Sequence, residues 1–502
     1  MKSIKCFLSV SSLLLALFIS VQGAAQQKVT PEMVDKLCRD VFREWNLPGM
    51  SIVVVKDGEV AFLNGYGKTG YTSKGENITP DTQFVIASTS KAFTAALLAT
   101  VIDEGKVKWS DTVVNHLPDF MLYDPWVTKN FLIRDIMVHK TGFNAYATDD
   151  LPHFGYSRDE IYRLLRHIKP TYSFRTTYAY NNAMYTVSAK IIEKYTGMSW
   201  DDAIKERLFK PLEMNSTTTG GRAFKTSAKL AAGHRHYKDG DSIKFSLRTD
   251  TLNGFRWLSA VAPAGFVMST ARDMGNWLKM HLNGGVFNGK TIISKENHRY
   301  LFVPQTISAW DSTSISNYAQ GWTLEQGVAG RLIRHTGLAY GYTALVGFVP
   351  ELKMGFAILT NAGNTTNPHL AIARELIEMY RGKDERDWRQ HYLSQFMKPS
   401  ATPPKREVKD TIPPKRGELY TGTYHKEDFG DVIITQKDGK LFFSLKSVKS
   451  EMRHKSGDTF SINVDGAGSI EVEFFPGVNT PIESLTFKIG DPIGYFYKRE
   501  EL

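Results

Sequence analysis

Residues 82–105 read TQFVIASTSKAFTAALLATVIDEG, a mostly apolar stretch that holds a serine and a lysine three positions apart. It predicts a buried helix that is opened by residues 88–91 and ended by Gly105, because glycine readily takes the backbone conformation that closes a helix. Ser88 and Lys91 would share one face at its amino end, where backbone N–H groups and the helix dipole favour an oxyanion. Serine is a poor nucleophile until a base takes its proton, and a desolvated lysine can be that base.

This Ser-x-x-Lys pattern is a weak signal on its own. About one or two matches are expected by chance in a chain of this length. Ser88 could instead cap the helix while Lys91 extends into solvent. The interpretation therefore depends on support from elsewhere in the chain.

A tyrosine and an asparagine supply part of that support. Tyr180 and Asn182 stand just before a helix expected over residues 182–196. A phenol there can shuttle a proton, and an amide can orient a substrate carbonyl. Taken alone, a buried aromatic beside a helix-capping asparagine is the simpler explanation.

A third motif, His335-Thr336-Gly337, ends a strand expected over residues 331–335. Threonine and glycine at this place would let a substrate lie against the strand edge, with the imidazole offering a hydrogen bond or a charge. The motif has little meaning by itself. Its value lies in its position after the serine, lysine and tyrosine.

The order and spacing of the three motifs resemble the serine β-lactamase and penicillin-binding-protein family, and look most like the branch of class C β-lactamases, D,D-carboxypeptidases, D-aminopeptidases and related esterases. Residues 139–143, HKTGF, are similar to the family's His-x-Ser/Thr-Gly-Leu turn, and residues 263–266, PAGF, lead into a helix expected over 270–283. The resemblance covers residues 36–381. It implies an α/β (α+β) β-lactamase-like fold, with an antiparallel sheet flanked by helices and an all-helical insertion.

The resemblance also implies a role for each residue of the motifs. Ser88 would attack a carbonyl and become acylated, with Lys91 and Tyr180 sharing the proton transfers; which of the two is the acylation base stays open. The backbone N–H groups of Ser88 and Leu338 would form the oxyanion hole. Neither a metal nor another cofactor is needed. The substrate would be positioned by Asn182, His335, Thr336 and Gly337.

The histidine of the third motif bears on the substrate. Lys-Thr-Gly also occurs at residues 68–70 and 140–142, but the family places this element last, so His335 takes the position. A lysine there is always cationic and suits a substrate carboxylate, whereas histidine is mostly neutral at pH 7 unless a neighbour raises its pKa. This weakens the case for efficient β-lactam hydrolysis and keeps D-Ala-D-Ala peptides, esters and D-amino-acid amides open.

We therefore expect an exported serine hydrolase that forms an acyl-enzyme on an amide or ester bond. The alternatives are a β-lactamase proper and a non-catalytic envelope-binding or sensor protein on the same fold. Two imidazoles, those of His234 and His236, would share a strand face and suggest a metal site, but the sequence offers no third ligand nearby. Surface histidines are the simpler interpretation.

The amino terminus and the composition bear on location and partners. Residues 1–25 carry two lysines, an apolar run and then small residues, which is typical of a cleaved secretory signal peptide. We expect a periplasmic or extracellular protein without a transmembrane span after cleavage. The net charge is +10, but in the absence of a nucleic-acid-binding motif we expect no nucleic-acid partner. The expected partner is a small-molecule or peptide substrate, cell-wall peptides included, and the oligomeric state stays open.

The rest of the chain predicts three further parts. A hydrolase domain is expected over residues 26–395, opened by a helix that Thr30 caps and followed by a hairpin around Asp57-Gly58. Prolines mixed with lysine and arginine indicate an extended linker over residues 396–416. Short alternating strands around Asp438-Gly439 predict a small all-β, barrel-like domain over residues 417–502.

Overall fold

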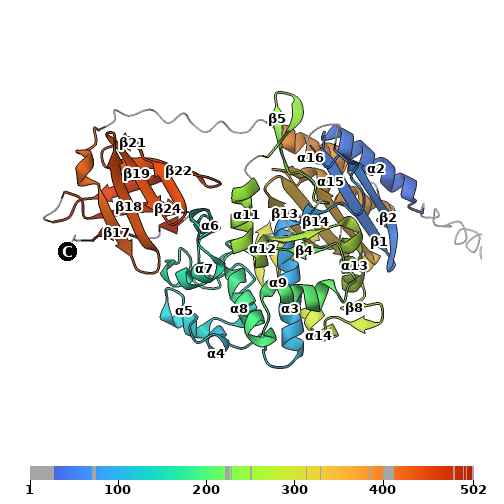
Figure 1. The fold of residues 1–502 in the computed structure, drawn as a ribbon. Helices are drawn as coiled ribbons and strands as arrows, with labels where there is room; N and C mark the ends of the chain where they lie inside the picture. The colour runs from blue at the N-terminus through green and yellow to red at the C-terminus, as the bar shows by residue number, and fades with distance from the viewer. Residues whose placement is uncertain are drawn as a thin grey trace, which may run out of the picture.

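The computed structural model describes residues 28–499, apart from 71–74, 221–226, 228, 249–250, 313, 328–329, 384–385, 399–411, 479–480, 490 and 493. The signal peptide expected over residues 1–25 and most of the expected linker over 396–416 lie outside these residues. Within the described part, no helix is both long enough and apolar enough to cross a membrane. Figure 1 shows a large sheet with its helices on the right, a helical region below it and a second sheet on the left.

The large sheet has eight strands, all antiparallel, in the order β10-β11-β12-β13-β14-β15-β1-β2. The expected amino-terminal hairpin is confirmed, with Asp57 and Gly58 at φ of 51° and 85° in its turn. It pairs with the late strands through β1 and β15. The strands are β1 (Gly49–Lys56), β2 (Glu59–Gly67), β10 (Thr306–Trp310), β11 (Ser314–Tyr318), β12 (Thr323–Gly327), β13 (Gly330–Ala339), β14 (Tyr342–Val349) and β15 (Met354–Thr360).

Helices α2 (Pro31–Glu44), α15 (Asn367–Arg381) and α16 (Trp388–Met397) lie together at one face of this sheet (Figure 1). The buried side chains of α2 and α15 form one core with those of β1 and β15. The expected cap of α2 is confirmed, since Thr30 Oγ1 accepts a hydrogen bond from Met33 N at 3.4 Å. Helix α15 begins at Asn367, and its N-cap Thr366 makes no side-chain capping bond.

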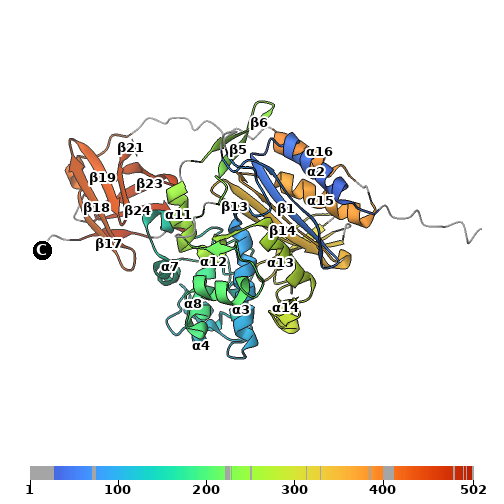
Figure 2. The same ribbon diagram turned by 45° about the vertical axis from the view of Figure 1, so that its right-hand side comes forward.

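The opposite face is covered by α3 (Ser90–Asp103), α13 (Ala271–Leu282) and the helical region around them (Figure 2). In this layer Phe93 stacks on Trp277 with ring centroids 3.8 Å apart. The other helices are α4 (Val113–His116), α5 (Pro125–Asn130), α6 (Leu151–Phe154), α7 (Arg158–Leu164), α8 (Met184–Thr196), α9 (Trp200–Ile204), α11 (Thr251–Ala260), α12 (Ala262–Gly265) and α14 (Lys295–Tyr300).

Short strands and turns complete this part of the chain. The turns are η1 (Ala87–Thr89), η2 (Ile133–Asp135), η3 (Leu165–His167), a π-helical turn η4 (Lys205–Phe209), η5 (Pro350–Leu352) and, in the β domain, η6 (Gly417–Leu419). The short strands are β3 (Phe84–Val85), β4 (Thr218–Thr219), β5 (His234–Asp239), β6 (Ser242–Leu247), β7 (Val267–Ser269), β8 (Val286–Phe287), β9 (Lys290–Thr291) and β16 (Ala362–Gly363).

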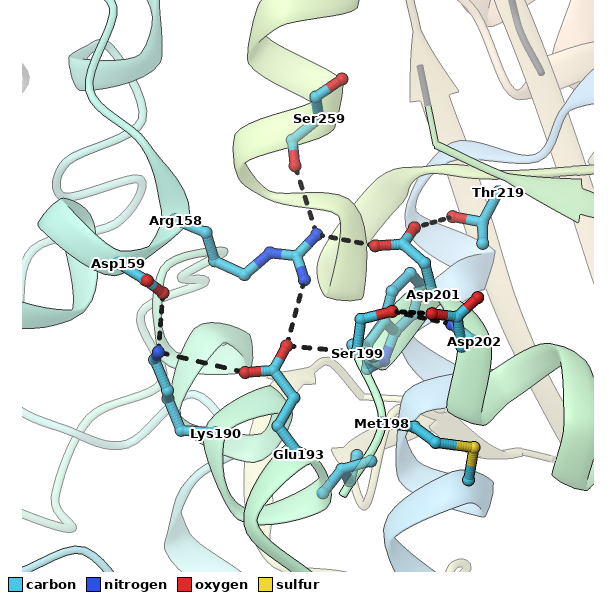
Figure 3. A network of polar contacts seen from close by, with 12 residues as sticks. Arg158, Asp159, Lys190, Glu193, Met198, Ser199, Asp201, Asp202, Thr219 and Ser259 are labelled. Atoms are coloured by element: carbon cyan, nitrogen blue, oxygen red, sulfur yellow. Dashed lines mark hydrogen bonds and ion pairs between the residues drawn. The ribbon is translucent and has the colours of Figure 1, made fainter. Parts of the chain in front are cut away.

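A polar network ties four helices of the helical region together (Figure 3). The Arg158 guanidinium of α7 lies 3.7 Å from Glu193 Oε1 of α8 and 3.4 Å from Asp201 Oδ2 of α9, and it donates to the Ser259 carbonyl oxygen of α11 at 3.4 Å. Lys190 of α8 pairs with an acid of α7 at 2.7 Å. The network fixes α8, at whose amino end the Tyr-x-Asn motif lies.

The carboxyl-terminal part is an all-β domain of short strands, which confirms the expected fold class. Its strand order is β20-β19-β18-β17-β26-β24-β23-β22-β21. Asp438 and Gly439 form the expected hairpin turn, at φ of 51° and 76°. The strands are β17 (Gly422–Lys426), β18 (Gly430–Lys437), β19 (Lys440–Leu445), β20 (Val448–Glu451), β21 (Arg453–Ser456), β22 (Thr459–Val464), β23 (Gly468–Phe475), β24 (Ser484–Ile489), β25 (Asp491–Pro492) and β26 (Phe496–Lys498).

The β domain packs on α6 of the helical region. The Phe154 ring lies 5.6 Å from that of Phe487 and 6.5 Å from that of Phe443. The Phe154 carbonyl oxygen accepts hydrogen bonds from Ser447 N at 3.0 Å and Ser447 Oγ at 2.9 Å. Tyr156 Oη donates to the Phe429 carbonyl oxygen at 2.6 Å. The buried apolar cluster of the helical region therefore continues into the β domain.

Candidate active site

Ser88 lies in the turn η1, directly before α3. The helix begins two residues later than expected, because Ile86 and Ala87 leave the strand conformation of β3 in a tight turn. Ala87 has φ of 46°, a left-handed conformation that costs a residue with a side chain of the order of 1–3 kcal/mol. Strain of this kind persists where the surrounding structure enforces it, and here it occurs at the residue directly before Ser88.

Lys91 is fully buried one turn further along. Its Nζ lies 3.3 Å from Ser88 Oγ, 2.6 Å from Asn182 Oδ1 and 2.9 Å from the Ala264 carbonyl oxygen. Burial lowers the pKa of Lys91 to about 7, partly opposed by the charge of Asp149. A neutral amine has two N–H donors, and the two carbonyl oxygens accept both of them. The nitrogen lone pair is then left for the Ser88 hydroxyl proton.

Tyr180 packs against the same lysine. Lys91 Nζ lies 4.6 Å from the centroid of its ring, and the Ser88 side chain interacts with the Tyr180 phenol and favours its ionised form. Burial raises the pKa of Tyr180 well above 10, so the phenol keeps its proton at neutral pH. The HKTGF turn holds it in place: the ring of His139 lies 4.3 Å away, and His139 Nδ1 accepts a hydrogen bond from Asn181 N at 3.0 Å.

Asn182 lies between the lysine and a carboxylate. Its Oδ1 accepts the hydrogen bond from Lys91, and its Nδ2 donates to Asp149 Oδ2 at 2.6 Å. The amide was expected to position a substrate carbonyl, and in this structure both of its ends have protein partners. Asp149 itself was missed by the sequence analysis. Nothing in its surroundings, ATDD at residues 147–150, distinguishes it from a surface acid.

His335 is a buried, neutral residue of β13, with 4% of its surface exposed. Its Nδ1 lies 2.6 Å from the Thr336 carbonyl oxygen, which can only accept, so Nδ1 carries the hydrogen. Nε2 then accepts from Tyr318 Oη at 2.8 Å. Burial, together with the nearby charge of Lys91, lowers the pKa of His335 to about 3. The imidazole therefore offers no positive charge to a substrate at neutral pH.

The His-Thr-Gly motif lies within β13 and not at the end of a strand as expected. The strand runs to Ala339 because it pairs with β14 through Ala339 and Tyr342, whereas β12 leaves it after Arg334. From His335 onward, one edge of β13 has no partner strand among the described residues. An extended substrate segment can pair with such an edge.

The free edge of β13 presents a backbone donor to the serine. Ala339 and Tyr342 flank a two-residue hairpin turn and form a hydrogen-bonded pair. Leu338 and Thr343 are therefore a non-bonded pair, which directs the Leu338 N–H away from β14, toward the open edge. Gly337 lies against the turn η1, since a Cβ on it would stand 3.1 Å from Ser88 N. The N–H groups of Ser88 and Leu338 are thus available together for an oxyanion.

The two histidines considered as metal ligands are buried in β5, and each holds a backbone carbonyl. His234 Nδ1 lies 3.1 Å from the Asn361 carbonyl oxygen, and His236 Nε2 lies 2.7 Å from that of Trp45. They are not the surface residues that the sequence suggested. No group of three metal-ligating side chains occurs in the part of the chain that the structure describes.

Comparisons with known proteins agree with this geometry. The Beta-lactamase family model matches residues 34–378, and a model named "Domain of unknown function (DUF3471)" matches residues 406–493. An unguisins hydrolase of Aspergillus campestris is 30% identical over 431 residues, which cover 80% of this chain and 76% of the relative. Penicillin-binding protein 4 of Amycolatopsis lactamdurans is 27% identical over 66% of this chain and 86% of its own length.

A solved structure has the same fold. The octameric penicillin-binding protein homologue from Pyrococcus abyssi superposes with a TM-score of 0.62 over 93% of this chain and 99% of its own, at 18% identity. At that identity the likeness concerns the fold alone. The family model spans well over half of this chain and includes the serine, lysine, tyrosine and histidine motifs. The chain therefore belongs to the Beta-lactamase family and is a serine hydrolase of the β-lactamase and penicillin-binding-protein type.

Proposed function

We propose that this protein is an exported hydrolase that cleaves an amide or ester bond through an acyl-enzyme on Ser88. The observation that carries the proposal is the contact between Ser88 Oγ and the buried Nζ of Lys91, at 3.3 Å. A lysine with a pKa of about 7 is neutral in about half of the molecules at pH 7 and is therefore matched to the task of a general base.

Acylation follows from the positions of the side chains. Lys91 takes the Ser88 proton while Ser88 Oγ bonds to the substrate carbonyl carbon. The N–H groups of Ser88 and Leu338 stabilise the resulting oxyanion. The carbon–nitrogen or carbon–oxygen bond then breaks, and the leaving group receives the proton from Lys91 through the phenol of Tyr180. Tyr180 is better suited to relay a proton than to act as the general base, because its pKa is raised.

Deacylation reverses the proton path. Water attacks the acyl carbonyl, gives its proton to the Tyr180 and Lys91 pair, and the same two N–H groups stabilise the second oxyanion. Collapse of this intermediate breaks the bond to Ser88 Oγ, which regains its proton. The product is a carboxylic acid.

The neutral His335 supports a substrate that needs no cation beside the third motif. D-amino-acid amides and simple esters, which need carry no carboxylate there, are therefore ranked first, and D-Ala-D-Ala peptides and β-lactams, which carry one, come after them. One relative's name states that it hydrolyses unguisins, and another's that it binds penicillin, so a β-lactam belongs among the substrates to be compared. A non-catalytic envelope-binding role is less favoured because Ser88, Lys91 and Tyr180 are all present in one cluster.

Export is part of the proposal and rests on residues 1–25. Secretion of the full chain, followed by amino-terminal sequencing of the product, is expected to give a start near residue 26. An intact amino terminus on cell-associated protein would contradict cleavage.

A substrate panel tests the hydrolytic function. We expect Ser88-dependent release from D-alanine p-nitroanilide, p-nitrophenyl acetate or a D-Ala-D-Ala peptide, with slower hydrolysis of benzylpenicillin. The Ser88→Ala variant is the control for each compound. Faster turnover of benzylpenicillin than of all the others would favour a β-lactamase, and absence of Ser88-dependent turnover throughout would overturn the proposal.

A further inference from the structure

A line of hydrogen bonds leads from the serine to a buried carboxylate that no motif includes. Lys91 Nζ lies 3.3 Å from Ser88 Oγ and 2.6 Å from Asn182 Oδ1, and Asn182 Nδ2 lies 2.6 Å from Asp149 Oδ2. The Asp149 carboxylate is therefore linked to the Ser88 hydroxyl through two intervening side chains, those of Asn182 and Lys91. It touches neither the serine nor the free edge of β13 in the contacts of the described residues.

Asp149 decides which way the amide of Asn182 faces. An amide has an accepting end and a donating end, and the lysine amine needs the accepting end for one of its two N–H groups. The donating end then needs an acceptor on its other side, which the carboxylate supplies. Without Asp149 the amide could turn its NH2 group toward Lys91 Nζ, and the amine would lose the partner that directs its lone pair at Ser88.

The backbone around Asp149 is held firmly. Trp257 Nε1 donates to the Asp149 carbonyl oxygen at 2.5 Å, and Asp149 N donates to the Tyr146 carbonyl oxygen at 3.0 Å. Tyr146 and Thr148 both have left-handed φ values, 60° and 71°. Two strained non-glycine residues within three positions cost of the order of 1–3 kcal/mol each, which the surrounding contacts must offset.

The contacts of the carboxylate also point beyond a purely structural role. Asp149 Oδ1 is buried and has no hydrogen-bond partner in the described part of the chain. A buried, unpaired carboxylate oxygen destabilises a fold. Lys91 is the cationic group whose charge acts on this carboxylate.

The charges of Asp149 and Lys91 affect each other's pKa. Burial raises the pKa of Asp149 to about 7, opposed by the Asn182 hydrogen bond and by Lys91. The aspartate charge raises the pKa of Lys91 in return. The other titratable groups that act on this pair or lie against it are His139, Tyr146, Asp150, Tyr180, Tyr185 and His335.

Five of these six neighbours carry no charge at neutral pH. Burial lowers the pKa of both histidines and raises that of the three tyrosines, so all five are uncharged near pH 7. Asp150 also has a raised pKa, but the hydrogen bonds of the Asn182 amide in the described part of the chain go to Lys91 and Asp149.

We infer that Asp149 is a positioning residue of the catalytic lysine, which through Asn182 holds Lys91 Nζ against the Ser88 hydroxyl and tunes its charge. The inference rests on the proposed function of Ser88 and Lys91. It assigns a function to a residue outside the three motifs.

Two substitutions distinguish the role of Asp149 as a hydrogen-bond acceptor from the role of its negative charge. Asp149→Asn keeps an oxygen that can accept from Asn182 and removes the negative charge, whereas Asp149→Ala removes both. We expect Asp149→Ala to lower kcat about 100-fold with a change in KM of less than about threefold, because a displaced base costs rate and not binding. Asp149→Asn should recover most of kcat. Asp241→Asn, on an exposed acid in the turn between β5 and β6, is the control and should leave kcat unchanged.

The titration of Lys91 gives a readout that does not depend on activity. With lysines labelled at Cε with carbon-13, and Lys91→Arg to assign the signal, NMR should show a midpoint near pH 7 in the parent. The midpoint should move to lower pH in Asp149→Asn, since the aspartate charge stabilises the protonated amine. The acid limb of kcat/KM should move in the same direction.

The outcomes are distinct. An unchanged Lys91 midpoint together with parental kcat in folded Asp149→Asn and Asp149→Ala overturns the inference alone. A shifted midpoint without any Ser88-dependent turnover in the parent supports the coupling and overturns the proposed function. If Asp149→Ala does not fold, Asp149→Asn still decides the question by NMR.

Discussion

The α-carbon of Gly337 lies so close to Ile86 that a Cβ on it would stand 2.0 Å from the Ile86 carbonyl oxygen. Real Cβ atoms do not approach a backbone oxygen to that distance, so this position of β13 requires glycine. The close approach brings the free edge of β13 against the turn that carries Ser88. The third motif therefore needs a glycine because two backbones pack closely at this position. That packing also brings together the two N–H groups of the oxyanion hole.

Gly337→Ala is expected to separate β13 from the turn η1 and to lower kcat/KM by about 100-fold, since a displacement of about 1 Å at a reacting centre can cost that much. Steady-state kinetics on folded protein measure it. Gly439→Ala is the control, because its Cβ would meet no atom within 4 Å although its φ is 76°. A Gly337→Ala enzyme with the kinetics of the control would show that the strand does not form part of the site.

The rate is expected to depend on pH through Lys91. Its pKa in the folded protein is lowered to about 7, so the neutral amine that can take the Ser88 proton is present above pH 7 and is lost as the pH falls below it. The acid limb of kcat/KM should thus have its midpoint near pH 7. His335 stays neutral over this range, since its pKa is lowered to about 3. His335→Gln should therefore leave the midpoint of the acid limb of kcat/KM unchanged. Disappearance of that limb in this variant would identify His335 as the titrating group.

Tyr180→Phe should keep the ring over Lys91 and remove the phenol that relays the proton. We expect kcat to fall by about 100-fold or more, in the range typical of a lost general acid–base group. The fall should be smaller with a p-nitrophenyl ester, whose leaving group departs without a proton, than with an amide. Equal losses for ester and amide would argue against a relay to the leaving group. Tyr178→Phe, which removes a neighbouring phenol hydroxyl and keeps the ring that packs on His139, is the control.

We expect the β domain and the hydrolase domain to unfold cooperatively, because the β domain packs on α6. Phe154 is fully buried between the two parts, so Phe154→Ala should cost about 3–5 kcal/mol of unfolding free energy. Calorimetry should show one transition in the parent and a separate, earlier transition of one part in the variant. Lys446→Ala removes a partly exposed ion pair with Glu160, at 2.7 Å, and a cation–π contact with Tyr156, and should cost at most about 2 kcal/mol. Equal small effects of both substitutions would mean that the two parts are independent.

Several elements were predictable from the sequence because their signals are local. The hairpin turns at Asp57-Gly58 and Asp438-Gly439 depend on residues that tolerate positive φ, and the Thr30 cap of α2 depends on a single hydroxyl. The start of α3 was less predictable, since apolar residues before Ser88 suit a strand or a helix equally well. Pairing of Phe84 with Ser269 of β7 decides for a strand.

Only those residues of the site that belong to the three motifs were predictable from the sequence. Ser88, Lys91, Tyr180 and the His-Thr-Gly motif have a recognisable order along the chain, and the structure brings them together. Asp149 has no such pattern, because its importance comes from a contact with Asn182 that forms only on folding. The neutrality of His335 likewise depends on burial and on Tyr318, which lies 17 residues earlier in the chain.

The most direct test of the central claim is rapid-quench mass spectrometry during turnover of p-nitrophenyl acetate, with peptide mapping of the acylated protein. We predict a mass increase of one acetyl group located at Ser88 in the parent, and a rate at least about 1,000-fold lower with no adduct in Ser88→Ala. An adduct on another residue, or hydrolysis by Ser88→Ala within tenfold of the parental rate, would contradict the account.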